Sequence, residues 1–329
     1  MSALNVLLPL GSTILSAVFA GLVLDQWWQR RHSFQLVWGL GLVFYGIATF
    51  TEFYGGAFGW TEPLYRVWYL VGAFFVAAYL GAGTIYLLSK TRFGYFAAAS
   101  IVLGGLFSLA ATTKYPGSSL AGSITLAAAV VAALAIALAT WRRREAQGHV
   151  AMAFLVAGSL VVAVLVLTAK VSGTYLDPAT HVPTAAGFPG YLRVASVPFN
   201  AGGGLAIVFG ALYSAYIYMP KKRVVEARLG VVAIVVNFFA SLPGAVVSLL
   251  HNRLNSRVPA TLLIALGAFI PGTTSSLNRF GVTWSFFLGE FVGVLLIFAG
   301  FLVSEEVFRN VRLGVTLWSR RSSLESELG

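Results

Sequence analysis

The chain has 329 residues, of which 58% are hydrophobic and only 10% are charged, whereas a soluble domain carries roughly 25% charged residues. It contains no cysteine, which excludes disulfide bonds, thiolate catalysis and cysteine-ligated iron–sulfur clusters. Its net charge of +11 is expected to reflect the cytoplasmic loops of a membrane protein, because Lys and Arg concentrate there, and not a nucleic-acid partner.

Apolar runs of about 20 residues, the length that spans a bilayer as a helix, recur along the chain. The first seven lie at about 3–24, 34–54, 64–88, 94–113, 119–141, 149–170 and 191–219. The segments between them alternate between basic ones, such as WRRRE at 141–145, and ones poor in Lys and Arg, such as GGAFGWTEP at 55–63. Because basic loops stay on the cytoplasmic side, we expect an external N-terminus and a first run that is a retained helix, not a signal peptide.

Three more apolar runs follow at about 229–250, 258–278 and 283–303. If all three cross the membrane, the 22 Lys and Arg residues divide into 12 inside and 10 outside, whereas 17 lie inside if run 229–250 does not cross. The positive-inside rule favours the second arrangement. Pro243 and Gly244 predict a break in the middle of that run. We expect a re-entrant or interfacial helix there, with a kinked spanning helix as the alternative.

The sequence therefore predicts an all-α protein, a polytopic transmembrane helix bundle with about nine spanning helices and a cytoplasmic C-terminus. A bacterial plasma (inner) membrane is the expected location. We expect a seven-helix bundle at 1–219, a cytoplasmic loop with the re-entrant or interfacial helix at 220–257, a two-helix hairpin at 258–303 and an amphipathic cytoplasmic tail at 304–329.

Ionisable residues fall at the predicted outer ends of the helices. Glu52 ends the second helix and Arg66 begins the third, so a short hairpin would let them pair. Glu290 lies about seven residues into the last helix, roughly 10 Å deep at 1.5 Å per residue. A charged group inside a bilayer costs roughly 2.5–3.5 kcal/mol or more and normally faces a partner or a cavity.

These residues predict a polar pocket that opens outward. Its candidate ligand-binding residues are Glu52, Arg66, Tyr69, Asn200 and Glu290. The alternative is a buried ion pair, with the remaining polar side chains reaching to the membrane surface.

Two glycine-rich stretches lie within predicted helices. FNAGGG at 199–204 has no strand before it, so it is no dinucleotide-binding fingerprint. Close helix packing is the favoured interpretation, and local unwinding beside Asn200 is the alternative that would suit a substrate site. Gly289 and Gly293 have the small-xxx-small spacing, which is also typical of packing.

No catalytic motif stands out, because HExxH, GxSxG and the Walker loop are all missing from the sequence. His32, His149 and His251 fall at the predicted cytoplasmic face without the spacing of a metal site, and we expect them to be solvated. The sequence thus predicts no catalytic residues, no cofactor and no metal site, and it favours a protein that is not an enzyme.

The predicted arrangement of helices over 3–219 resembles the topology of rhodopsins and seven-helix receptors. The seventh helix has no Lys for a retinal Schiff base, however, and Lys170 lies at the wrong end of the sixth. The phrases GWTEPLYRVWYLVGA and LGEFVGVLLIFAGFLVSEEVF resemble those of uncharacterised bacterial polytopic integral membrane proteins. That resemblance implies no function.

Three functions remain open on the sequence alone. The first is binding, transport or sensing of a small molecule or lipid through the outward-facing pocket. The second is a non-catalytic structural subunit of a larger membrane complex, and the third is an intramembrane lipid-modifying enzyme with Glu52 or Glu290 as general base. Expected partners are membrane lipids, with anionic headgroups at the basic face, and other protein subunits, but no nucleic acid.

Overall fold

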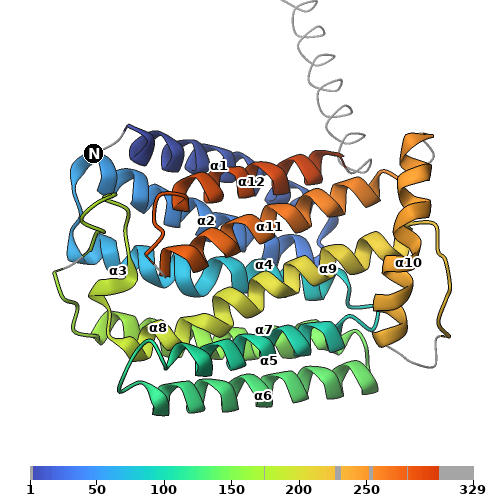
Figure 1. Cartoon of the computed structure of the whole chain (residues 1–329), viewed down its shortest axis with the longest axis horizontal. Helices are drawn as coiled ribbons and strands as arrows, with labels where there is room; N and C mark the ends of the chain where they lie inside the picture. The colour runs from blue at the N-terminus through green and yellow to red at the C-terminus, as the bar shows by residue number, and fades with distance from the viewer. Residues whose placement is uncertain (1–2, 174, 227–230, 252–254, 280, 304–329) are drawn as a thin grey trace, which may run out of the picture. The chain divides into compact units, whose positions relative to one another are not determined.

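The computed structural model describes residues 3–173, 175–226, 231–251, 255–279 and 281–303 (Figure 1). Within these residues the regular structure is helical, apart from one isolated β-bridge between Leu176 and Pro183. The all-α prediction is confirmed. The predicted amphipathic tail at 304–329 lies outside the described residues.

Nine helices in the described part of the chain are long and apolar enough to cross a membrane. Two of them are continuous helices in which a π-helical turn, η1 or η3, separates two α-helical segments. The nine are α1 (Leu4–Arg30), α2 (Ser33–Phe58), α3–η1–α4 (Glu62–Leu70, Val71–Phe75 and Val76–Leu87), α5 (Gly94–Ala111), α6 (Ser119–Arg142), α7 (Ala146–Thr168), α8–η3–α9 (Gly190–Val197, Pro198–Gly202 and Gly203–Tyr218), α11 (Arg257–Arg279) and α12 (Phe286–Val303). The prediction of about nine spanning helices is therefore confirmed by length and composition.

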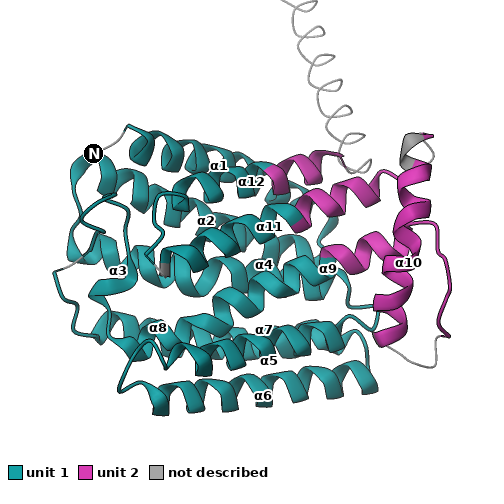
Figure 2. Ribbon diagram, in the orientation of Figure 1, with its two compact units in different colours: residues 1–210, 266–295 teal, residues 211–265, 296–329 magenta. Residues whose placement is uncertain are grey.

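Contacts divide the chain into two compact units (Figure 2). Unit 1 comprises residues 1–210 and 266–295, and unit 2 comprises residues 211–265 and 296–329. The division at 219, 257 and 303 that the sequence suggested stays a prediction.

The basic segments of unit 1 gather at one end of its helices. The end of α4 lies against the start of α2, where Gly83 approaches Trp38, and against the start of α7, where Gly148 approaches Tyr86. The start of α5 lies against the end of α6, where a Cβ on Gly94 would overlap a threonine side chain. The basic connections α1–α2, α4–α5 and α6–α7 therefore share one end, as the positive-inside rule requires of cytoplasmic loops. Which side of a membrane this end faces stays a prediction.

The glycine-rich stretches are sites of close packing, as predicted. A Cβ on Gly203 would overlap the Ala77 carbonyl oxygen, so α9 and α4 touch through their backbones. On α12, a Cβ on Gly289 would overlap Thr274 of α11, and one on Gly293 would overlap Pro271. Small residues at these positions let the helices approach without a side chain between them.

The two π-helical turns contact each other inside unit 1, and Phe74 of η1 meets Phe199 of η3 edge-on at 5.3 Å between ring centroids. Pro198 begins η3, and because proline lacks an N–H it cannot donate the α-helical bond at that position. The chain at Gly202–Gly204 is nevertheless not unwound. It stays helical, and the widened turn that begins at Pro198 ends at Gly202.

Unit 2 contains α10 (Val231–Leu250), which is shorter in its apolar stretch than the nine long helices. The predicted break at Pro243-Gly244 is wrong, because α10 continues through Pro243 as one helix. A proline within a helix removes one backbone hydrogen bond but need not end the helix when neighbours hold it. Within unit 2, α10 runs across the end of α9 (Figure 2), and Ala245 packs in a cluster with Ala215, Met219 and Val258.

The contact between α4 and α9 can be tested with two adjacent glycines. Gly203→Ala should destabilise the protein by about 1–3 kcal/mol, because the new methyl would meet backbone atoms that cannot rotate away. Gly204→Ala is the matched control, since nothing lies within 4 Å of its Cβ position, and it should be neutral or gain about 0.5–1 kcal/mol of helix stability. Thermal unfolding in detergent measures both variants. Equal unfolding midpoints would contradict the close approach.

Candidate functional site

Glu52 lies inside unit 1, one and a half turns before the end of α2. The sequence placed it at the helix end, but α2 continues to Phe58, six residues further, which is about 9 Å at 1.5 Å per residue. Its side chain is 1% exposed. The Trp68 indole Nε1 donates a hydrogen bond of 2.7 Å to Glu52 Oε1. Glu52 is therefore a buried acid held by an uncharged donor from α3.

Tryptophan rings close the turn of α2 that follows Glu52. A Cβ on Gly55 would overlap the Trp60 ring, and Trp60 meets Trp68 edge-on at 5.9 Å between centroids. Only glycine at position 55 leaves room for this ring. The indoles keep solvent from Glu52 on this side.

Glu290 reaches Glu52 from α12. Its backbone carbonyl accepts a hydrogen bond of 2.8 Å from the Tyr45 hydroxyl, two turns before Glu52 on α2. Helical side chains lean toward the N-terminus of their helix. The N-terminal end of α12 is the end beside Trp68, because Phe286 and Phe287 belong to the same aromatic cluster. The Glu290 side chain therefore leans toward Glu52, and the two carboxyl groups lie within hydrogen-bond reach.

The approach of two carboxyl groups sets a chemical requirement. Two bare carboxylates about 4 Å apart repel by about 4 kcal/mol at an effective dielectric constant of about 20, and they have no hydrogen to share. Among the described residues, no N–H or O–H donor reaches the buried Glu52 Oε2. A proton or another cation at this point would satisfy that oxygen and remove the repulsion.

The ion pair between Glu52 and Arg66, which the sequence left open as the alternative to a pocket, is not formed. The Arg66 guanidinium instead donates to Glu62 Oε1, at 2.6 and 2.9 Å, and to main-chain carbonyls at the end of α7, including Ala169 at 2.7 Å. Glu62 stands one turn before Arg66 on the same helix, which is the favourable spacing for such a pair. Arg66 thus caps the C-terminus of α7, where positive charge is stabilising, and Glu52 has no cationic partner among the described residues.

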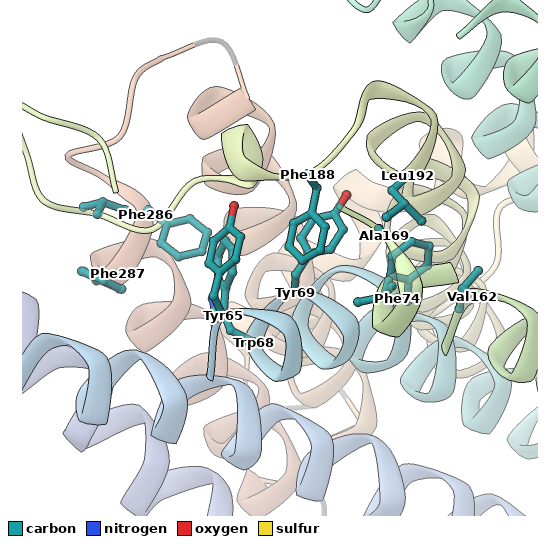
Figure 3. Packing of buried hydrophobic residues seen from close by; sticks show 12 residues of the cluster. Tyr65, Trp68, Tyr69, Phe74, Val162, Ala169, Phe188, Leu192, Phe286 and Phe287 are labelled. Carbon is teal, nitrogen blue, oxygen red and sulfur yellow. The ribbon is translucent and has the colours of Figure 1, made fainter. Parts of the chain in front are cut away.

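Tyr69 and Asn200 lie in other parts of unit 1. Tyr69 is buried in the aromatic cluster, with its ring stacked on Phe188 at 4.2 Å (Figure 3). Asn200 is half-buried in η3, whose main neighbours are α5, α4, α8 and η1. Of the five candidate ligand-binding residues, the structure therefore brings together only Glu52 and Glu290. A ligand role for any of the five stays a prediction.

Tyr45 is a partner of the acidic pair that sequence reasoning missed. Tyr45 and Glu52 are seven residues apart in one predicted helix, and this spacing places them on the same face. The signal was therefore present in the sequence. What the sequence lacked was any indication that the last helix packs against that face.

The long connection between α7 and α8 folds over the aromatic cluster. Tyr65, at 0% exposure the centre of this cluster (Figure 3), donates its hydroxyl hydrogen to the Thr184 carbonyl and accepts from the Gly187 N–H at 3.1 Å. Thr180 bonds to Asn5 of α1 through its carbonyl at 2.7 Å, and to Thr283 beside α12 through its hydroxyl at 2.6 Å. These bonds attach one loop to α1, α3 and the start of α12.

Asp177 organises the outer part of this connection. Its Oδ1 accepts hydrogen bonds from the main-chain N–H of Thr180 at 2.9 Å, from the Thr180 hydroxyl at 3.0 Å and from the Ala179 N–H at 3.0 Å. The N–H of Thr180 is the largest cause that lowers the pKa of Asp177 below its ordinary value. The carboxylate form therefore holds the turn.

Among the described residues, no group of three His, Cys, Asp or Glu side chains is placed to hold a metal ion. His149 Nδ1 lies 3.1 Å from the Tyr86 hydroxyl in a hydrogen bond, and His251 Nδ1 lies 2.8 Å from the Val247 carbonyl. No protein-family model, curated protein or solved structure matches the chain. A functional interpretation therefore depends on the geometry of the residues themselves.

Replacing Tyr65 tests the attachment of the α7–α8 connection. Tyr65→Phe removes the bond to Thr184 and leaves the buried Gly187 N–H without its acceptor, which costs about 1–3 kcal/mol. Peptides from 171–189 should then exchange amide hydrogen for deuterium faster, by about tenfold or more, while peptides from the bundle are unchanged. Tyr54→Phe is the control, because that side chain is 44% exposed. Unchanged exchange in Tyr65→Phe would contradict the anchor.

Acid should loosen the same connection through Asp177. Because its pKa is lowered in the folded protein, its stabilisation is full above the ordinary aspartate pKa, about 3.9, and is lost as the pH falls through the lower folded value. The absence of native cysteine allows a fluorophore on Ala186→Cys. Its anisotropy should be constant from neutral pH down to the ordinary aspartate pKa and fall below it. In Asp177→Asn the anisotropy should already be low at neutral pH, and a high value there would contradict the role of Asp177.

Proposed function

We propose that this membrane protein binds a small molecule and transports or senses it, with the carboxyl pair of Glu52 and Glu290 at the centre of its site. The observation that carries the proposal is the approach of these two acids, from α2 and α12, inside an apolar unit. A charge within a membrane costs roughly 2.5–3.5 kcal/mol or more on insertion scales. Two acids side by side, with no Lys or Arg bonded to either among the described residues, are difficult to explain as a device for stability.

The proposal narrows the site that the sequence suggested. Arg66 is assigned to the cap of α7 and Tyr69 to the aromatic cluster, since their observed contacts explain both side chains. Glu52 and Glu290 remain as the groups that would contact a ligand. Their two acceptor groups favour a ligand that carries a positive charge or hydrogen-bond donors.

A second element of the proposal concerns the lipid around the basic end of unit 1. The Arg31 guanidinium lies over the rings of Trp27 and Trp28, at 4.8 and 4.4 Å from their centroids, and Trp28 is 67% exposed. Tryptophan beside arginine is typical of the headgroup level of a bilayer. We place this end at the cytoplasmic face of a bacterial plasma membrane, against anionic headgroups.

The proposal predicts that Glu290→Gln folds but loses its ligand. The amide keeps the size of the side chain and removes its negative charge, so a bound cation or donor should be weakened at least tenfold, about 1.4 kcal/mol. Native mass spectrometry of protein released gently from its own membranes should show a small molecule retained by the unmodified protein and absent from Glu290→Gln. Glu62→Gln is the control, because this half-exposed carboxylate serves Arg66.

The opposite results are equally clear. A ligand that Glu290→Gln retains as well as the unmodified protein does would refute the assigned site. A stoichiometric protein partner with no ligand would instead support the structural-subunit alternative.

A further inference from the structure

We infer that Glu52 and Glu290 bind one proton between them, so that the site binds or releases a proton when it works. The inference deepens the proposed function and depends on it for its biological meaning. Its structural basis is separate and lies in the geometry of the two side chains.

Glu52 has an incomplete set of hydrogen bonds among the described residues. Its side chain is 99% buried, and Oε1 is satisfied by the Trp68 indole at 2.7 Å. Oε2 is also buried, and no N–H or O–H donor within the described part of the chain reaches it. A carboxylate oxygen buried without a donor is costly. The carboxyl group of Glu290 is within reach of the Glu52 carboxyl group.

A shared proton supplies the donor that completes this contact. An ionised carboxylate only accepts hydrogen bonds, whereas a protonated one also donates. The contact between the two carboxyl groups is therefore a hydrogen bond only if one of them carries a proton. Two carboxyl groups that share one proton are a known arrangement, in which the proton belongs to the pair.

The charged side chains of α3, the helix that bonds to Glu52, are already bonded to other groups. Tyr45 is the other titratable side chain that faces the pair, and its hydroxyl already donates to the Glu290 backbone. The nearest charges on α3, Glu62 and Arg66, are bonded to each other and to α7. The helix α1 carries no ionisable side chain between Leu4 and Leu24, and α12 carries none besides Glu290. The described surroundings therefore offer no fixed cation that could take the place of the proton.

Loss of the proton would leave the pair unstable. Two carboxylates would then face each other in a place sealed by the indoles of Trp60 and Trp68. The two carboxylates must then separate or bind a cationic ligand. Binding of a proton and binding of a cationic ligand are then alternative ways to satisfy the same two groups, so that one is released when the other binds. This is the basis of exchange between a proton and a solute.

Infrared spectroscopy of the full-length protein in phosphatidylcholine nanodiscs tests the inference directly. A protonated carboxyl gives a C=O stretch that is separate from the carboxylate bands and shifts in deuterium oxide. We expect this band in the unmodified protein at neutral pH, and we expect it to decrease as the pH is raised. Glu52→Gln and Glu290→Gln should each change it by at least half, while Glu62→Gln should leave it unchanged.

A chemical probe covers the case in which a Gln variant fails to fold. An apolar carbodiimide reacts with protonated carboxyl groups inside membranes, so dicyclohexylcarbodiimide should modify Glu52 or Glu290 of the unmodified protein. Peptide mass spectrometry should show at least a severalfold higher yield at low pH than at high pH. Because this probe is applied to the unmodified sequence, its result does not depend on whether a Gln variant folds.

The outcomes separate this inference from the proposed function. No protonated-carboxyl band at neutral pH, or no adduct on either glutamate, would overturn it. Ligand retention lost in Glu290→Gln without any band would leave the proposed function intact and refute the proton. If both Gln variants change the band but Glu290→Gln still retains the ligand, the shared proton would be supported and the proposed ligand site would be refuted.

Discussion

The constraint on which this structure depends is that a polar group inside an apolar helix bundle must find its partner within the protein, because lipid offers none. Glu52 illustrates the consequence. Its side chain bonds to Trp68 of α3 and lies beside Glu290 of α12, so one side chain on α2 joins helices that are more than two hundred residues apart in sequence. The Tyr45 hydroxyl adds a bond from α2 to the backbone of α12. The helix α12 is thereby fixed against α2, near the beginning of the chain.

The packing of α12 explains why Glu290 faces α2. Gly289 and Gly293 stand four residues apart, on the face that lies against α11. A rotation of about 100° per residue directs the next positions toward another side of the helix, and there Phe291 contacts Gly11 of α1. The helix α12 thus lies between α11 and the α1–α2 pair within unit 1. Gly289 and Gly293 make the contact of α12 with α11, whereas Phe291 and Glu290 make its contact with α1 and α2.

The sequence predicted the helices well and the pairing of their side chains poorly, for a physical reason. The apolar runs matched the nine long helices within a few residues at most ends, because the bilayer fixes their length. The partner of Arg66 could also have been found, since Glu62 stands one turn away. The partner of Glu52 could not, because hydropathy does not tell which non-adjacent helices touch. The break predicted at Pro243 failed because local propensity was given more weight than the neighbours that hold a helix together.

The acidic pair and the α7–α8 connection belong to one assembly. Trp68 holds Glu52 and lies stacked against Tyr65 at 5.5 Å between ring centroids. Tyr65 in turn holds the connection through Thr184. A movement of Glu52 away from α12 would alter the indole that bonds to Glu52, and through it the tyrosine that anchors the loop. The loop also bonds to Thr283 at the start of α12, so it is linked to the pair from both helices. The connection is therefore linked to the pair by two routes, through α3 and through α12.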